Sequence, residues 1–346
     1  MKHPCILFVG PMLGKHSGWV PNPAEILVPN LSREGYTCLL TSDVLNRYLR
    51  LIDILHTVIR DRDRYDIVSI QTYSGKSIIV EDLVSWVARI LGKKIVMVLH
   101  GGNMPVFMQK FPDWSRRILR RAHAIVTPSA YLQAAVALYG FDAHIIPNLL
   151  EIEKYPYRLR ENVRPRLLWM RTFYEYCHPE LAVEILARLS GHYEDASLTM
   201  SGQDKGLLEP TKRLVERRGL QSKVRFAGFL NEAAKQREFG MHDIYINTNR
   251  IDNMPIAVIE AGAFGLPVVA MSVGGIPYLL KDEQTGLLTP FGDVDAMVDA
   301  VCRLVEQPAL AARISRQGRF LAEKSSWEKV FPLWDSIFQQ VYERGI

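Results

Sequence analysis

The sequence predicts an α/β protein made of two doubly wound domains. Short apolar runs bounded by Gly, Pro, Asn or Asp recur along the whole chain, and helical patterns fill the gaps between them. The runs do not alternate strictly between apolar and polar residues, which is typical of parallel strands buried on both faces. Because 346 residues are too many for one ordinary core, we expect two such domains.

Each half of the chain supplies six predicted strands. Parallel sheets of this kind bind ligands at the carboxyl ends of their strands, so a facing pair would hold its ligand in the cleft between the domains. The predicted strands are 6–9, 37–40, 67–70, 95–99, 124–126 and 144–146 in the first half, and 167–170, 197–200, 224–227, 244–246, 268–270 and 286–288 in the second.

The boundary between the halves is predicted at residues 148–165, which are charged, include Pro156 and Pro165 and lack sustained periodicity. We therefore expect a first domain over 1–150, a linker, and a second domain over 164–325. The remaining segment, 326–346, is expected to form a packing helix. Its apolar residues at helical spacing are Trp327, Val330, Trp334, Ile337, Phe338 and Val341.

Composition restricts the function classes. A hydrophobic content of 48% and a charged content of 23% are those of a soluble globular protein. The surplus of 42 Lys and Arg over 37 Asp and Glu is too small to indicate nucleic acid as a partner. No apolar run is long enough for a signal peptide or a membrane span, and we expect a cytoplasmic protein. Four scattered cysteines, without zinc-like spacing, are expected to be reduced thiols: Cys5, Cys38, Cys177 and Cys302.

The most informative stretch is 252–277, reading DNMPIAVIEAGAFGLPVVAMSVGGIP. Asp252 and Glu260 bracket the start of a short helix that has Pro255 near its first turn. A helix N-terminus offers free backbone N–H groups and a positive dipole end to an anion. Glu260, about two turns along, would reach a group attached to that anion. The expected ligand is a phosphate bearing hydroxylated groups; the alternative is an amphipathic helix with two solvated carboxylates.

This stretch resembles the signature of the retaining glycosyltransferases of family 4, which is Glu, seven residues, Glu, and then a Gly-Gly-Ile-Pro turn. Asp252 stands in place of the first Glu. The resemblance implies the GT-B fold, two Rossmann-like domains facing across a cleft, with the last helix packing back on the first domain. It also implies that Glu260 holds the ribose of a nucleotide-sugar donor. The sugar and the diphosphate would lie against Asp252 and the helix start, Asn253, Met254, Pro255 and Ile256.

Two sites in the first half are candidates on the same resemblance. The loop from Gly10 to Gly18 has three residues between its glycines where a phosphate-binding P-loop has four, and His16 where Ser or Thr would bind magnesium, so the ATPase interpretation is rejected. In the family this loop approaches the donor phosphates, which makes Gly14 a donor-binding candidate. His100 ends the fourth predicted strand, and the resemblance directs it at the donor sugar; alternatively it only caps the strand.

Two cations are candidates for the diphosphate. Arg171 follows the first strand of the second half, where the family has an arginine, and a guanidinium offers forked donors to phosphate oxygens. The lysine that the family places a few residues later is missing, and His178, which stands in that region, is expected to be structural. Lys205, after the next strand, can supply this charge from a neighbouring loop, or can form an exposed salt bridge instead.

Residues 107–121 form a basic and aromatic segment with two interpretations. It can rest on an anionic membrane surface at the inner face of the membrane. Alternatively, Phe111, Trp114 and Ile118 fall on one helical face and belong to the core, with the arginines in solvent. The core interpretation is slightly favoured.

Together these features predict a hexosyltransferase-type enzyme of glycan biosynthesis. It would move a sugar from a nucleoside-diphosphate sugar to a glycan, lipid-linked or small-molecule acceptor with retention, using His100, Asp252 and Arg171. No metal and no cofactor besides the donor substrate are expected, since helix N–H groups and Arg171 can neutralise the diphosphate. The alternatives are a non-catalytic nucleotide-sugar-binding protein and a nucleotide-sugar epimerase or hydrolase on the same fold.

Overall fold

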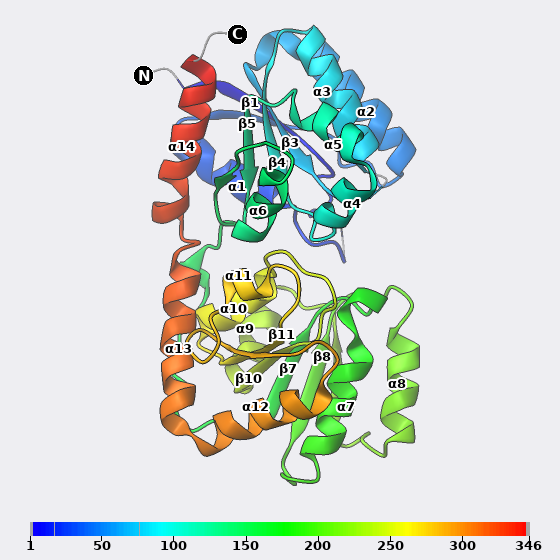
Figure 1. Cartoon of the computed structure of the whole chain (residues 1–346), viewed down its shortest axis with the longest axis vertical. Coiled ribbons are helices and arrows are strands. Elements are labelled where there is room, and N and C mark those ends of the chain that lie inside the picture. Colours follow the sequence, from blue (N-terminus) through cyan, green and yellow to red (C-terminus); the bar gives the residue numbers. More distant parts are fainter. Residues whose placement is uncertain (1–2, 17, 76, 344–346) are drawn as a thin grey trace. The chain divides into compact units, whose positions relative to one another are not determined.

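The computed structural model describes residues 3–16, 18–75 and 77–343. The chain divides into two compact units, Met1–Leu149 with Trp327–Ile346, and Leu150–Ser326. Each unit contains one six-stranded parallel sheet with helices on both faces (Figure 1). The doubly wound α/β architecture predicted from the sequence is confirmed in both units.

The sheet of the first unit has the strand order β2-β1-β3-β4-β5-β6. One face packs on α1 and α14, and the other on α2 to α6. All six residues of β3 are buried, which explains why the sequence shows no alternation here. The strands are β1 (Cys5–Val9), β2 (Thr37–Leu40), β3 (Ile67–Thr72), β4 (Lys94–Leu99), β5 (Ala124–Thr127) and β6 (His144–Ile145). The helices are α1 (Pro23–Arg33), α2 (Arg47–Arg60), α3 (Ile78–Ile90), α4 (Met104–Lys110), α5 (Pro112–Leu119), α6 (Ala130–Ala137) and α14 (Trp327–Glu343), with a 3₁₀ turn at η1 (Arg62–Arg64).

The sheet of the second unit has the order β12-β11-β10-β7-β8-β9. The strands are β7 (Arg166–Met170), β8 (Ser197–Ser201), β9 (Val224–Gly228), β10 (Ile244–Asn247), β11 (Val268–Met271) and β12 (Leu287–Thr289). The helices are α7 (Pro179–Leu189), α8 (Leu208–Arg217), α9 (Glu232–Met241), α10 (Ile256–Phe264), α11 (Ile276–Leu279), α12 (Val294–Glu306) and α13 (Pro308–Glu323), with 3₁₀ turns at η2 (Ile152–Lys154) and η3 (Glu175–Cys177). Each predicted strand therefore matches an observed strand within two residues at either end.

The strand orders locate a crevice in each sheet. In the second unit the chain runs outward from β7 through β8 to β9, then returns to place β10 on the other side of β7. The connections that leave β7 and β10 therefore diverge to opposite sides, and ligands bind at such switch points in open parallel sheets. In the first unit the corresponding switch point lies between β1 and β3.

The C-terminal helix α14 belongs to the core of the first unit. Val330, Trp334 and Phe338 lie on its buried face, at the i, i+4, i+8 spacing of one helical stripe. The ring of Phe338 meets Phe8 of β1 edge to face, with ring centroids 6.3 Å apart. This helix thus completes the hydrophobic core on the α1 side of the first unit's sheet.

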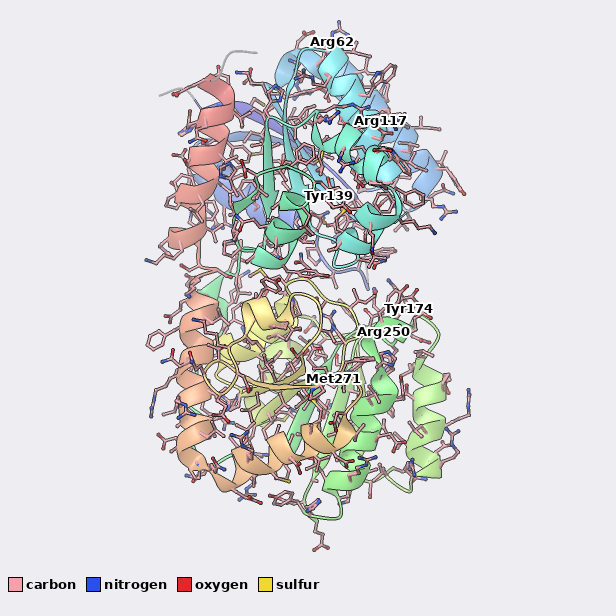
Figure 2. The ribbon with its side chains drawn as sticks, viewed as in Figure 1. Arg62, Arg117, Tyr139, Tyr174, Arg250 and Met271 are labelled. Carbon is pink, nitrogen blue, oxygen red and sulfur yellow. The ribbon has the colours of Figure 1, made fainter. Side chains whose placement is uncertain are left out.

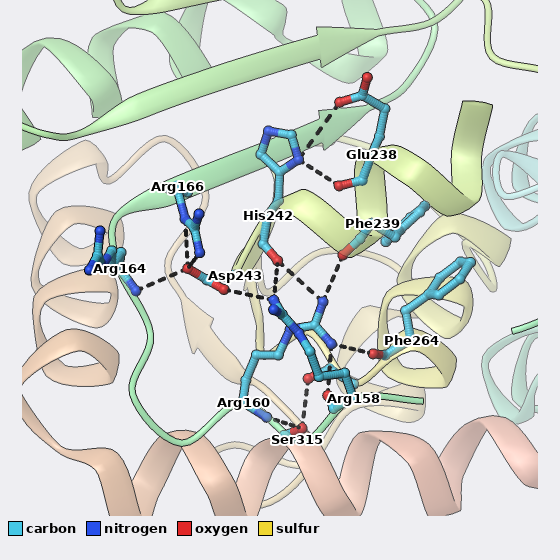
Figure 3. A network of polar contacts seen from close by, with 11 residues as sticks. Arg158, Arg160, Arg164, Arg166, Glu238, Phe239, His242, Asp243, Phe264 and Ser315 are labelled. Carbon is cyan, nitrogen blue, oxygen red and sulfur yellow. Dashed lines mark hydrogen bonds and ion pairs between the residues drawn. The ribbon is translucent and has the colours of Figure 1, made fainter. Parts of the chain in front are cut away.

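Residues 150–165, which the sequence suggested as part of a linker, are grouped with the second unit. Arg160 is only 3% exposed, and its guanidinium donates hydrogen bonds to the carbonyl oxygens of Phe264 at 2.6 Å and Phe239 at 2.7 Å (Figure 3). These carbonyls belong to the last turns of α10 and α9, where carbonyl groups have no intrahelical hydrogen-bond donor. A buried arginine therefore ties this segment to the C-terminal ends of both helices. Burial lowers the pKa of Arg160 to about 10.

For residues 107–121, the core interpretation is confirmed for the residues that the structure buries. Phe107 and Ile118 lie in the core of the first unit, and Trp114 is partly buried with its indole N–H on Asp82 at 2.7 Å. The interpretation is wrong for Phe111, which is 39% exposed and not part of the core. Arg117 and Arg121 both pair with Asp82.

Candidate functional site

The N-terminus of α10 forms the centre of the candidate site in the second unit. The helix begins after Pro255, whose backbone is extended, and no side chain caps its first turn. The carbonyl of Pro255 accepts from the N–H groups of Val258 and Ile259, so the N–H groups of Ile256 and Ala257 precede the first intrahelical bonds. This leaves backbone donors and the positive dipole end facing the switch point, as an anion site requires.

The turn at Gly274 and Gly275 packs against the residues that precede this helix. Gly275 donates its N–H to the carbonyl of Asp252 at 3.0 Å, and a Cβ at Gly275 would lie 1.8 Å from the carbonyl oxygen of Asn253. Only glycine permits this approach, because such a distance is far below van der Waals contact. The Gly-Gly turn after β11 thereby holds residues 252–253 in place.

Asp252 is the hub of a polar cluster rather than a free carboxylate. Its Oδ1 accepts the N–H of Asn253 at 2.9 Å, and its Oδ2 accepts from Arg171 at 3.0 Å and from the amide of Asn249. A carboxylate offers about four acceptor positions, so three are already in use. One acceptor position of Asp252 therefore remains.

Arg171 follows β7 directly, at the switch point. Its side chain is 23% exposed, and Asp252 is its ion-pair partner. Burial alone would lower the pKa of Arg171, but the adjacent carboxylate of Asp252 raises it above its usual range. The guanidinium therefore remains charged, and its Nε has no hydrogen-bond partner within the described chain. A forked donor with spare N–H groups beside a helix N-terminus suits phosphate oxygens.

The loop carrying Lys205 is hydrogen-bonded to the loop carrying Arg171. Arg171 donates its N–H to Ser201, and Lys205 donates its N–H to the carbonyl of Phe173 at 3.1 Å. A Cβ at Gly202 would lie 1.8 Å from the carbonyl of Arg171, so a glycine is needed where the two loops touch. Lys205 is exposed, and in the part of the chain that the structure describes no carboxylate pairs with it. The exposed salt bridge that was the alternative for Lys205 does not form there.

Glu260 lies in the second turn of α10 and is 4% exposed. Its Oε1 accepts from Lys235 of α9 at 2.6 Å and from the hydroxyl of Tyr155 at 2.9 Å. Burial and this carboxylate together raise the pKa of Tyr155. The carboxylate is therefore oriented and held through one oxygen, unlike the solvated Glu of the alternative interpretation.

In the first unit, His100 follows β4. Its Nε2 lies 2.8 Å from Oε1 of Gln71, which fixes the ring, and the ring stacks on Tyr73 with centroids 5.3 Å apart. Burial lowers the pKa of His100 to about 4. The imidazole is consequently neutral near pH 7, and a small cavity lies beside it, lined in part by Leu27, Val98 and Trp334.

Gly14 has a structural partner in the same unit. Its N–H points at both carboxylate oxygens of Glu25, at 3.1 and 3.2 Å, and Glu25 also completes the capping box of α1 with Asn22. Lys15 pairs with Asp43, and His16 Nε2 lies 2.8 Å from the Asp43 carbonyl. These contacts hold the glycine-rich loop against α1 and the segment after β2, within the first unit.

The structure therefore gathers Arg171, Asp252, Asn253 and the helix start into one cluster, with Glu260 further along α10, whereas His100 and Gly14 belong to the first unit. Across the described residues, no group of three or more His, Cys, Asp or Glu side chains is arranged to hold a metal ion. Nor does any described helix combine the length and apolarity needed to cross a membrane.

Three residues of this cluster were missed from the sequence. Lys235 and Tyr155 reach Glu260 from 25 and 105 residues away, so no local spacing connects them. Asn249 follows β10 at the switch point, and its position after a strand end was the signal that could have found it.

Comparisons with known proteins agree with this geometry. The family model described as Glycosyltransferase Family 4 matches residues 18–154, and the one described as Glycosyl transferases group 1 matches residues 153–320. An uncharacterized glycosyltransferase of Haemophilus influenzae is 28% identical over 152 residues, 43% of this chain and 42% of that protein. The match thus spans less than half of that relative's length.

Two further similarities extend over more of the chain. A phosphatidyl-myo-inositol mannosyltransferase of Mycobacterium leprae is 25% identical over 271 residues, 75% of this chain and 71% of that protein. The crystal structure of Anabaena HepE in complex with UDP superposes with a TM-score of 0.77 at 16% identity, covering 98% of this chain and 100% of that one, which shows a shared fold. With two successive family models matched along its length, the chain belongs to the family 4-like glycosyltransferases of group 1.

Proposed function

We propose that the protein transfers a sugar from a nucleoside-diphosphate sugar to an acceptor with retention at the anomeric carbon. The observation that carries the proposal is the uncapped N-terminus of α10 with Arg171 beside it and the oriented carboxylate of Glu260 in its second turn. A diphosphate and a ribose are the two groups of such a donor that these residues suit, since one needs cationic and N–H donors and the other needs an acceptor.

In the proposed mechanism, binding and leaving-group stabilisation come from fixed charges. Arg171 and the N–H groups at the start of α10 would hold the diphosphate, with Lys205 adding a second positive charge from the neighbouring loop. These donors would interact more strongly as negative charge develops on the leaving diphosphate, which is the condition for accelerating the reaction. Asp252 would orient Arg171 and contribute one remaining acceptor position to the sugar.

His100, neutral because of its lowered pKa, would contribute a hydrogen bond to the donor sugar rather than a charge. Glu260 would accept from the ribose hydroxyls. We further propose that turnover needs no divalent metal. The cationic groups named above would neutralise the diphosphate charge that a metal ion neutralises in metal-dependent enzymes. Four free cysteines and no disulfide among the described residues support a cytoplasmic setting.

A thermal-shift panel tests the proposal. The chain would be melted with each common nucleoside, nucleoside diphosphate and nucleoside-diphosphate sugar, and release of the diphosphate would be followed with glycan, lipid-linked and small-molecule acceptors. We expect one diphosphate series to raise the Tm, the matching nucleoside to raise it less, and release to require an acceptor. Stabilisation by none of the diphosphates would refute the site. Binding without release would indicate a binding protein, and release without an acceptor a hydrolase.

A further inference from the structure

Two neighbouring helices of the first unit carry apolar side chains on the face that points away from the sheet. The inner face of α2 buries Ile54 and Val58, and that of α3 buries Val84 and Ala88. The opposite faces are expected to be polar in a surface helix. Instead they expose several large apolar side chains. Six of these we name the α2–α3 face: Leu49, Ile52 and Ile59 of α2, and Leu83, Trp86 and Ile90 of α3.

The α2–α3 face is an organised surface rather than a scatter of single residues. Ile52, Trp86 and Ile90 are 64%, 54% and 65% exposed. Positions 83, 86 and 90 follow i, i+3, i+7, and positions 49, 52 and 59 follow i, i+3, i+10, so each set forms one stripe along its helix. The two helices lie side by side in Figure 1 and contact each other. Exposed apolar residues grouped on two adjacent helices make this face a candidate interaction surface.

The helices of this face, and α5 that contacts α3, lie in a part of the chain rich in basic residues. Residues 45–121, which span α2, α3 and α5, contain 14 Lys and Arg against 7 Asp and Glu. This surplus of seven exceeds the +5 of the whole chain, so the rest of the chain is slightly acidic. Figure 2 labels two of these residues, Arg62 and Arg117.

The nearby acids offset only part of this charge, because each of two carboxylates is shared by two arginines. Asp82 is held by Arg117 and Arg121, and Asp61 by Arg60 and Arg64. By contrast, none of the described carboxylates pairs with Arg47 or Arg120.

We propose that the α2–α3 face docks onto a membrane surface that contains anionic lipids. Apolar stripes flanked by arginines bury in the interface between headgroups and acyl chains, and the arginines attract anionic headgroups. A second copy of the chain is a poorer fit, because self-association through this face would bring two positively charged surfaces together. The proposal is independent of sugar transfer, since docking requires no donor and no turnover.

Flotation of the full chain with vesicles tests the proposal. Vesicles of phosphatidylcholine alone are compared with vesicles containing one quarter phosphatidylglycerol, at low and high salt. We expect the chain to float with the anionic vesicles at low salt, and to be released by high salt. Equal binding to both vesicle types, or to neither, would overturn the proposal.

Matched variants separate the apolar and the charged contributions. The triple variant Ile52→Gln, Trp86→Gln, Ile90→Gln, and the double variant Arg47→Glu, Arg120→Glu, should each reduce partitioning by about tenfold or more. The control for the apolar variant is Leu138→Gln with Phe320→Gln, which changes exposed apolar residues outside the α2–α3 face. The control for the charge variant is Arg213→Glu with Lys281→Glu, which changes exposed basic residues of the second unit. The controls should bind as the parent does. Equal losses in the controls and the test variants would contradict the assignment to this face.

Two further measurements keep the result decisive. If the triple variant does not fold, Trp86→Phe replaces it, because Phe keeps an apolar side chain at this position. Quenching of tryptophan fluorescence by brominated lipid should then be weaker in Trp86→Phe than in the parent. Unchanged quenching would place Trp86 outside the membrane and refute the proposal. Sedimentation without vesicles should show that the parent chain does not self-associate through this face. If the parent self-associates and the triple variant does not, the face is a contact between copies instead.

Discussion

Replacement of Glu260 should affect both the fold and nucleotide binding, in separable amounts. The carboxylate is buried, while the ammonium of Lys235 at 2.6 Å has a side chain that is 26% exposed. Removing one partner of a buried pair costs roughly 3–5 kcal/mol, and the partial exposure of Lys235 reduces this to about 2–4 kcal/mol for Glu260→Ala. Glu260→Gln should cost less, because its amide oxygen still accepts from Lys235 and Tyr155.

The effect on ligand binding has a different origin. Charged hydrogen bonds from a carboxylate to ribose hydroxyls contribute about 1.5–3 kcal/mol, so we expect nucleotide affinity to fall roughly tenfold to hundredfold. Chemical denaturation measures the first effect, and calorimetric titration of the nucleoside diphosphate at a temperature where the variant is folded measures the second.

Glu238→Ala is the matched control for this experiment. Glu238 is also a buried acid of the second unit with an arginine partner, Arg225, but it lies on α9 away from the α10 N-terminus. Its replacement should destabilise the fold and leave nucleotide affinity unchanged. Undiminished affinity in folded Glu260→Gln and Glu260→Ala, or equal losses in Glu238→Ala, would refute the ribose assignment.

Three further predictions concern other parts of the molecule. Arg171→Ala should reduce diphosphate affinity and turnover while leaving nucleoside binding nearly intact. Arg171→Lys should not fully restore diphosphate affinity and turnover. Equal losses of nucleoside and diphosphate affinity in titrations would show that Arg171 lies outside the site. Burial raises the pKa of Glu81 to about 8, so the folded chain keeps its proton between about pH 4.5 and 8 while the unfolded chain loses it. Stability should therefore fall as pH rises through this window by about 1.4 kcal/mol per unit from this group, and denaturation of Glu81→Gln should lack that slope; an identical slope would show that Glu81 ionises normally. Full turnover should persist in excess chelator, and a loss restored by magnesium or manganese would contradict leaving-group stabilisation by Arg171 and the helix.

The strands and the helix start at Asn253 to Ile256 were predictable because their signals are local. Buried parallel strands appear as continuous apolar runs, and Pro255 with the following Gly-Gly turn marks where α10 begins and how it is supported. The position of Arg171 after β7 follows from the same strand pattern.

The remaining features depend on contacts distant in sequence. Residues 150–165 resemble a linker in composition, but Arg160 is buried because two helix C-termini supply carbonyl acceptors for it. The partners of Glu260 could not be inferred, since Tyr155 precedes the second sheet and Lys235 lies on another helix. The exposure of Trp86 could not be inferred either, because an apolar stripe in sequence is normally a buried one.

A crystal structure of the chain with the nucleoside diphosphate that raises its Tm most would test the central claim directly. We predict that the diphosphate oxygens lie at the N–H groups of Ile256 and Ala257 and within hydrogen-bond distance of Arg171, and that a ribose hydroxyl donates to Glu260. A nucleotide bound elsewhere, with Arg171 still paired only to Asp252 and no ligand at the start of α10, would contradict the claim.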